Sequence, residues 1–321
     1  MDDEQQHSAR PPDSLVLPRF CGVATFMRLP QPPEAAGLDV AVLGLPSDNG
    51  SPFRTGARFG PKAIRDASVM LRPVNPYRGN IDVFSALRVA DLGDAAVVPG
   101  YMPATLLQME AAVRRVADAG ACPLLLGGDH GVSIAALRAV AGRHGQPLAL
   151  VHFDAHSDTW DAYFGGERHS AGTPFRRAVE EGLVDPRRSL QLGLRGSLFS
   201  PDDVEQSRRL GYEVLSTDEM LAEAPAALAD RIARRTGGAP VYLSFDLDVV
   251  DPASAPGVQT PEAGGPSARE MLAILRALHG VEIVGADVVE CNPLFDGPGA
   301  VTALLGATVA AEILALKAVS R

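Results

Sequence analysis

Short apolar runs alternate along the chain with amphipathic segments of helical periodicity. Eight runs rich in branched and aromatic residues predict strands: LDVAVLGLP (38–46), LRVADLGD (87–94), CPLLLGG (122–128), PLALVHFD (147–154), RSLQLGL (188–194), YEVL (212–215), PVYLSFDLD (240–248) and VEIVGADVVE (281–290). Helical patterns fall between many of them, around 104–119, 131–143, 217–235 and 267–279, and a closing helix starts near Ala300. This alternation predicts an α/β fold with a mainly parallel sheet covered by helices on both faces.

The domain organisation follows from what the pattern lacks. No Pro/Gly/Ser-rich linker and no internal repeat divides the chain, so we expect a single-domain, three-layer α/β/α structure. The acidic and polar start predicts a flexible tail over residues 1–16, followed by one catalytic domain over 17–321.

Composition narrows the classes of function. The 321 residues are 46% hydrophobic and 21% charged, enough for a sizeable core. A net charge of −10 without runs of Lys or Arg argues against nucleic acid and against an anionic membrane surface as partners. Three cysteines with no C-x-x-C spacing suggest a reducing compartment. The N-terminal residues show no apolar signal segment, and the apolar stretches look too short to span a membrane, so we expect a soluble cytoplasmic protein.

Potential ligands for a metal gather where four of the predicted strands end. A doubly wound sheet builds its site at the carboxyl ends of its strands. The residues placed there are His130, Asp154, His156, Asp158, Asp246, Asp248 and Glu290. In HFDAHSD (152–158) the three ligand candidates occupy every second position, and alternate side chains of an extended backbone point to one side. They are therefore expected to converge.

The charge of this set predicts metal ions. Two imidazoles and four aspartates carry too much negative charge to lie together unless cations offset it. Carboxylate-rich ligation with some imidazole suits Mn²⁺, and a two-metal site holds its ions roughly 3.5–4 Å apart. Some of these residues have simpler interpretations when each is taken alone. Asp246 and Asp248 could cap a turn, and His152 is expected to be a buried core residue.

Several longer motifs resemble those of the ureohydrolases, the arginase and agmatinase family. They are GGDHG, HFDAHSD, SFDLDVVDP, PEAGG, PSDNGSPFRTGARFGPKAIR, GTPFRRA, QLGLRG and VVECNP, and together they span nearly the whole chain from about Pro18. The opening PRFCGVATFMRLP is similar to the agmatinase-like branch, which includes guanidinobutyrase, guanidinopropionase and proclavaminate amidinohydrolase. This branch acts on linear guanidino compounds.

The resemblance implies a role for each matching residue. His130 would bind one Mn²⁺ with Asp154, Asp158 and Asp246. His156 would bind the second, with the same three aspartates and Asp248 contributing or bridging. Glu290 would hold the substrate guanidinium, whose planar fork of donors a carboxylate accepts in pairs. The implied reaction is hydrolysis of a compound of the agmatine or 4-guanidinobutyrate type to urea and an amine, with Asp158 able to carry the proton. Relatives form trimers and hexamers, so a homo-oligomer is implied.

The sequence departs from the family pattern at three positions. Ala171 stands where the family usually has a proton-shuttling histidine, and His169 either replaces it as a catalytic residue or lies on the surface. Gln259 replaces a glycine in P-G-x-G-T-P, which adds bulk beside the substrate. Gly131 stands where a small hydroxyl residue is common.

These departures keep two alternatives open. One is a formiminoglutamase-like hydrolase that cleaves another carbon–nitrogen bond, and the other is a non-catalytic metal-binding paralogue. The segment 160–171 is expected to face the far end of the substrate through Trp160 and Arg168. Arg168 would favour a carboxylate at that end, whereas Asp161 or Glu167 would favour an amine. The chain has neither the G-x-G-x-x-G opening nor the G-K-[ST] loop of nucleotide-binding sheets.

Overall fold

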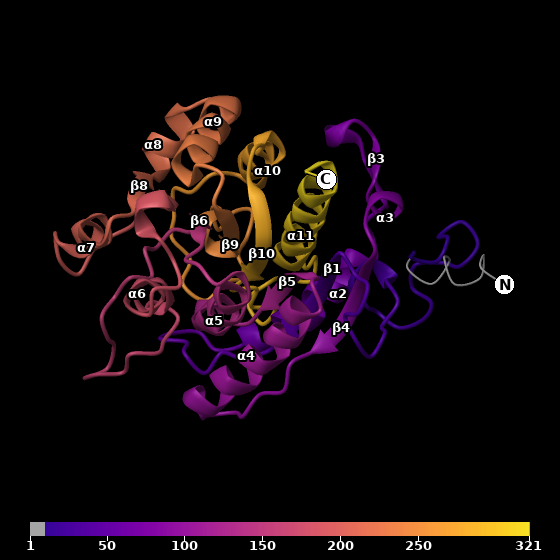
Figure 1. The fold of residues 1–321 in the computed structure, drawn as a ribbon, viewed down its shortest axis with the longest axis horizontal. Coiled ribbons are helices and arrows are strands. Elements are labelled where there is room, and N and C mark those ends of the chain that lie inside the picture. The colour runs from indigo at the N-terminus through magenta and orange to yellow at the C-terminus, as the bar shows by residue number, and fades with distance from the viewer. Residues whose placement is uncertain (1–9, 321) are drawn as a thin grey trace.

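A computed structural model describes residues 10–320 and confirms the α/β architecture (Figure 1). Eight parallel strands form one sheet in the order β4-β1-β5-β10-β9-β6-β7-β8. All eight predicted strands are present: β1 Val40–Leu45, β4 Val89–Asp94, β5 Cys122–Gly127, β6 Ala149–Phe153, β7 Leu190–Leu194, β8 Glu213–Ser216, β9 Pro240–Asp246 and β10 Glu282–Val289. A small antiparallel pair, β2 Val74–Asn75 and β3 Ile81–Asp82, lies outside this sheet.

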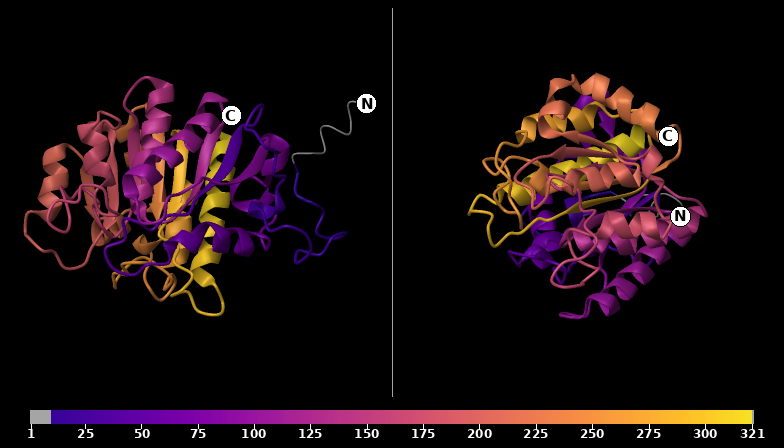
Figure 2. Two further views of the ribbon diagram at one scale, coloured as in Figure 1. Left: turned by 90° about the horizontal axis from the view of Figure 1, so that it is seen from below. Right: turned by 90° about the vertical axis from the view of Figure 1, so that its left-hand side faces the viewer.

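Helices cover both faces of the sheet, as the two views of Figure 2 show. One face packs against α4 Met102–Asp118, α5 Ser133–His144 and α6 Pro174–Glu180. The other packs against α2 Gly60–Ser68, α9 Pro225–Thr236, α10 Ala268–Ala277 and α11 Val301–Val319. Strands β1, β6 and β9 are buried along their whole length. Burial on both faces explains why their sequences are mostly apolar at successive positions.

The helices differ from those expected from the sequence in two ways: one expected helix is divided in two, and four short helices were not expected. The single helix expected over 217–235 is two helices, α8 Thr217–Ala222 and α9, because Glu223 and Ala224 are extended ahead of Pro225. Four helices lack a counterpart among the expected patterns: α2, α3 Val83–Ala86, α6 and α7 Asp203–Leu210. Each has nine residues or fewer, too few for a clear hydrophobic period.

Helix α11 corrects the expectation that no apolar stretch approaches the length of a membrane span. Within its 19 residues, an 18-residue window has a mean hydropathy of 1.6, so length and composition alone would allow a crossing. However, 72% of that window is buried within the protein, where α11 packs against α2, α10 and β10. Its apolar composition is that of a core helix.

The parallel arrangement brings the strand ends that carry the candidate ligands together. Strands β5, β10, β9 and β6 are consecutive in the middle of the sheet, and all four end at the same edge. Of the expected tail, residues 1–9 lie outside the described part of the chain. Arg10 forms an ion pair with Asp82, and the carbonyl of Leu17 accepts a hydrogen bond from Arg28.

Candidate active site

Three carboxylates surround one nitrogen of His130 at the edge where β5, β6 and β9 end. His130 Nδ1 lies 3.0 Å from Asp154 Oδ2, 2.9 Å from Asp158 Oδ2 and 3.0 Å from Asp246 Oδ2. The imidazole is buried, and within residues 10–320 no hydrogen bond satisfies this Nδ1. A buried nitrogen lone pair facing three acidic oxygens is the donor set of a metal site.

The protonation of His130 is determined by a chain of hydrogen bonds behind it. His130 Nε2 lies 2.8 Å from Ser244 Oγ, and Ser244 Oγ donates to Asp287 Oδ1 at 2.6 Å. Because the serine proton is engaged with the carboxylate, Ser244 accepts from Nε2–H, so Nδ1 is the nitrogen that can exchange a proton for a cation. Tyr242 and Ser133 also donate to Asp287, each at 2.6 Å.

A second group of ligands lies beside the first and shares Asp154 with it. His156 Nδ1 lies 3.1 Å from Asp248 Oδ2 and 3.4 Å from Asp154 Oδ1. The ligand atoms of these three residues lie within 4.8 Å of one another, as do those of His130, Asp154, Asp158 and Asp246. The structure therefore brings together all six residues that the sequence suggested as metal ligands. They form two adjoining groups, each able to hold an ion.

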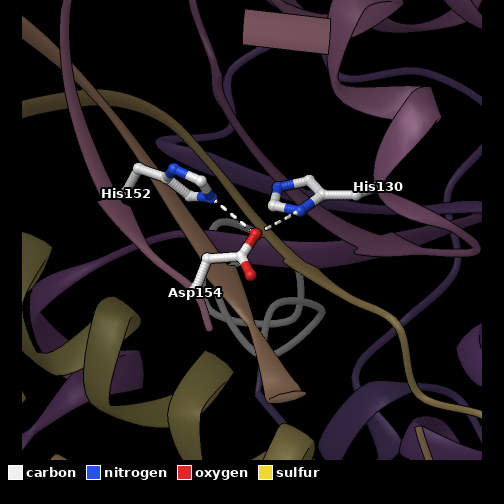
Figure 3. A group of neighbouring side chains, drawn as sticks. All are labelled: His130, His152 and Asp154. Carbon is white, nitrogen blue, oxygen red and sulfur yellow. Dashed lines mark hydrogen bonds and ion pairs between the residues drawn. The ribbon is translucent and has the colours of Figure 1, made fainter. Parts of the chain in front are cut away.

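His152 lies behind Asp154 rather than in the cavity, as expected for a buried histidine. Figure 3 shows His152 and His130 both directed at the Asp154 carboxylate. Gln191 Nε2 donates to His152 Nδ1 at 3.2 Å, so the ring proton is on Nε2, which donates to Asp154 Oδ2 at 2.8 Å. His152 is thus a hydrogen-bond donor that orients a ligand carboxylate.

The backbone route by which the ligands of HFDAHSD converge differs from the expected one. Strand β6 ends at Phe153, so the alternation of an extended strand does not extend to Asp158. The chain turns instead: Asp154 Oδ1 accepts the backbone N–H of His156 at 2.6 Å, and Asp158 adopts a positive φ of 50°. Acidic turn residues tolerate this conformation better than most, and strained backbone of this kind clusters at functional sites.

Gly128 allows the turn that carries His130. A Cβ at this position would lie 1.7 Å from the carbonyl oxygen of Ser47, so a residue with a side chain cannot occupy it without moving the backbone. The Gly128 carbonyl also accepts the backbone N–H of Glu290 at 2.9 Å, which ties the end of β10 to that of β5.

The pKa values of the site reflect uncompensated negative charge. Burial, together with neighbouring carboxylates, raises the pKa of Asp158, Asp246 and Asp248. Burial alone would lower the pKa of His130 and His156, but the adjacent aspartates raise both well above the usual range. The site favours added positive charge, whether protons or metal cations.

Glu290 lies at the end of β10 beside both ligand groups and lines the same cavity as Asp158, Asp246 and Asp248. Its φ of 67° is unusual for a glutamate. Its Oε1 accepts the backbone N–H of His130 at 2.8 Å. Burial and the charge of Asp129 raise the pKa of Glu290 well above that of a free glutamate, so a cationic ligand would be favoured there.

The cavity above the ligands has a volume of about 770 Å³ and is lined by Trp160, Tyr163 and Phe199. The Trp160 ring centroid lies 6.0 Å from that of Tyr163 and 5.7 Å from that of Phe199. Ala171 also lines the cavity. Trp160 therefore lies in the cavity wall above the ligand groups.

Two predicted site residues are not brought to this cavity in the described structure. Arg168 is exposed and pairs with Glu180 at 2.5 Å. His169 faces the helical layer, where burial and the charge of Arg138 lower its pKa. Gly131, the third departure from the family pattern, has the backbone of Ser170 and Met102 Cε about 3 Å from where a Cβ would lie. It therefore allows the segment before Gly172 to pack closely on the site.

Comparison with known proteins identifies the family. The Arginase family model matches residues 38–316. Guanidinopropionase from Pseudomonas aeruginosa is 47% identical over 97% of this chain and 96% of its own length, and guanidinobutyrase from the same organism is 43% identical over 93% of each. The solved structure of proclavaminate amidinohydrolase from Streptomyces clavuligerus is 43% identical, with a TM-score of 0.90 over 95% of this chain and 100% of that one.

The chain therefore belongs to the arginase family, with the fold of that family. It is a hydrolase that acts on carbon–nitrogen bonds of linear amidines, in a family that depends on metal ions. The resemblance stated from the sequence motifs is confirmed.

Proposed function

We propose that this protein is a dinuclear manganese amidinohydrolase that converts a linear guanidino compound of the agmatine or 4-guanidinobutyrate type to urea and an amine. The observation that carries the proposal is the pair of ligand groups that share Asp154 at the base of one cavity. Carboxylate-rich sites with one imidazole per ion suit Mn²⁺ among the divalent metals.

The donor set fits two ions per chain. His130, Asp154, Asp158 and Asp246 would hold one, and His156, Asp154 and Asp248 the other, with Asp158 and Asp246 available to bridge. His130 Nδ1 is buried and has no hydrogen-bond partner among residues 10–320, as a ligand nitrogen requires. When bound, such ions lower the pKa of a water molecule and so supply a nucleophile at neutral pH.

The residues of the chain orient the substrate and move the proton. Glu290 binds the guanidinium beside the ligand groups, which directs its carbon toward the two metal positions. Asp158 lines the cavity as well, so its carboxylate can hold the proton released by the water and pass it to the leaving nitrogen. The buried ring of carboxylates stabilises the cationic substrate and its amine product.

Of the two substrate types, the amine agmatine and the acid 4-guanidinobutyrate, the residues of the cavity wall favour the acid. Arg54 and Arg208 line the cavity. The guanidinium of Arg54 lies 4.6 Å from the centroid of the Phe295 ring and forms no ion pair with any residue in 10–320. A cation held by an aromatic ring and without an acidic partner can receive a carboxylate. The names of the two Pseudomonas relatives, guanidinopropionase and guanidinobutyrase, agree with this choice.

The proposal also includes the cellular compartment and the oligomeric state of the protein. All three cysteines, Cys21, Cys122 and Cys291, are free thiols, which supports a reducing compartment such as the cytoplasm. A homo-oligomer, trimer or hexamer, is proposed from the family resemblance. Light scattering on the purified protein measures the number of subunits directly.

The test is urea release by the manganese-loaded protein across agmatine, arginine, 4-guanidinobutyrate, 3-guanidinopropionate and guanidine. We expect turnover of a guanidino acid. A product other than urea would favour the formiminoglutamase-like alternative. Two bound metal ions per chain with no urea from any compound would favour the non-catalytic paralogue.

A further inference from the structure

Gln259 has a fixed orientation against Glu290. It is buried, with 1% of its surface exposed, and its Nε2 lies 3.0 Å from Glu290 Oε1. In the ionised form that binds a cation, Glu290 only accepts hydrogen bonds, so the amide group presents its NH₂ to Glu290 Oε1. Its carbonyl Oε1 therefore faces the other way, and this buried oxygen has no hydrogen-bond partner in the described chain.

Glu290 also has one oxygen that receives no hydrogen bond from the described residues. Its Oε1 already accepts two hydrogen bonds, from the His130 backbone N–H and from Gln259, while its buried Oε2 accepts none from the described residues. A carboxylate that binds a guanidinium by itself uses both oxygens. Here, one of the two is occupied by Gln259.

Buried polar atoms in native proteins nearly always have a partner, and two unpartnered acceptors on neighbouring side chains indicate a missing donor. Both residues line the cavity that contains the ligand groups. We propose that Glu290 Oε2 and Gln259 Oε1 together receive the two terminal amino groups of the guanidinium, so that Gln259 is a specificity-determining residue. This inference rests on the proposed function, because it assumes that a guanidine binds in this cavity.

A carboxylate and a carboxamide differ from a carboxylate alone in two ways. The pair carries a single negative charge spread over a wider acceptor, which matches one guanidinium cation. The side chain of Gln259 also fills space at the inner end of the cavity, where a shorter residue would leave room. Guanidines bearing a substituent on a terminal nitrogen should therefore be excluded, because the substituent removes a donor and meets Gln259.

A purely structural role for Gln259 makes a different prediction. If the amide only holds Glu290 at its unusual φ of 67°, then removing it should weaken all guanidines in equal proportion. Selectivity between guanidines is therefore the quantity to measure, since misplacement of Glu290 would not change it.

The experiment is calorimetric titration of the manganese-loaded protein with methylguanidinium and with N,N′-dimethylguanidinium. The first can direct its methyl group toward the cavity mouth, and the second must place one methyl at the inner end. The variants are Gln259→Gly, which removes both the amide and the bulk, and Gln259→Met, which removes the amide, acceptor and donor together, but keeps the bulk. Gln206→Met, on α7 and outside the cavity lining, is the matched control.

We expect the unaltered protein and the control to prefer methylguanidinium by at least tenfold. Gln259→Gly should reduce that preference to about twofold or less, and Gln259→Met should weaken methylguanidinium at least fivefold while still excluding the dimethyl compound. An unchanged preference in Gln259→Gly, in a protein that releases urea, overturns this inference alone. Failure of the metal-loaded protein to bind either compound or to release urea overturns the proposed function as well.

Discussion

His130 and Ser244 are joined by a 2.8 Å hydrogen bond that determines which histidine nitrogen faces the acidic ligands. Ser244 gives its own proton to Asp287, so it can only accept from His130 Nε2. The imidazole is thereby held as the tautomer whose Nδ1 is free for a cation. This polar chain runs from the turn after β5, which carries His130, to Ser244 on β9 and Asp287 on β10, and all three side chains are buried from water.

Replacing Ser244 with alanine should weaken metal binding. The imidazole loses the acceptor that fixes its tautomer, and loss of such an outer partner typically costs about 10–100-fold in metal affinity. The measurement is competition for Mn²⁺ against a chelator of known affinity. Ser133→Ala is the matched control, because the Ser133 hydroxyl donates to the same Asp287 but does not bond to the His130 imidazole; the backbone bond from Ser133 N–H to the His130 carbonyl is kept in the variant. Equal losses in both variants would show that the polar chain matters only for packing.

The two ligand groups should be separable by mutation. His130→Ala removes the nitrogen of one group and His156→Ala that of the other, so each variant should retain about one manganese ion per chain where the unaltered protein binds two. Elemental analysis after gel filtration gives the number. His144→Ala, exposed at the end of α5, should retain both ions. A single ion in the unaltered protein would contradict the dinuclear proposal.

Removing the metals should make stability depend more strongly on pH. In the metal-free protein the pKa of Asp158, Asp246 and Asp248 is raised by burial and mutual charge, and burial raises that of Asp129 to about 7. A carboxyl with a raised pKa in the folded state contributes stability at low pH and loses it as pH rises through the folded value.

The free energy of unfolding of the chelator-treated protein should therefore fall between about pH 5 and about pH 8. The manganese-loaded protein should show a smaller slope, because bound cations compensate the ionised carboxylates. Denaturant unfolding with and without chelator at several pH values measures both slopes. Parallel slopes would mean that these carboxylates are not compensated by the added metal.

The choice of a guanidino acid as substrate depends on a cation in the cavity wall. Arg54→Ala should raise the KM for 4-guanidinobutyrate about fivefold, with little change in kcat, since a partly exposed charge pair contributes on the order of 1 kcal/mol. The KM for agmatine should stay constant or fall. Arg209→Ala is the control, because Arg209 pairs with Asp202 and does not line the cavity. The same KM in both variants would argue against a carboxylate contact at Arg54.

The sheet and its ligand-bearing edge were predictable because strands leave a strong local pattern. Apolar runs such as CPLLL and PVYLSF are each followed by a potential metal ligand, His130 and Asp246. Parallel pairing brings the ends of such strands to one edge of the sheet. Convergence of Asp154, His156 and Asp158 was predicted correctly but for a wrong reason, since strand β6 stops at Phe153 and a turn completes the approach.

The supporting residues were not predictable in the same way. Nothing in the local sequence marks Ser244 or Gln191 as a supporting residue. Their partners, His130 and His152, lie far away in the sequence. Asp287 did carry a signal, because an acid inside the apolar run VEIVGADVV must have buried donors nearby. The contact between Gln259 and Glu290 joins segments 31 residues apart and appears only once the fold is formed.

His169 remains the residue whose role depends on movement of the segment before Gly172. In the structure its ring lies near Arg138 and Glu181, away from the cavity, whereas Ala171, where the motif resemblance implies a histidine, lines the cavity. We therefore expect His169→Ala to retain urea release within about twofold, since the ring does not reach the reacting atoms. Ala171→His should instead change the pH dependence of kcat by adding a titratable group to the cavity. A loss of more than tenfold in His169→Ala, with metal content intact, would show that the segment moves during turnover and that His169 carries the proton.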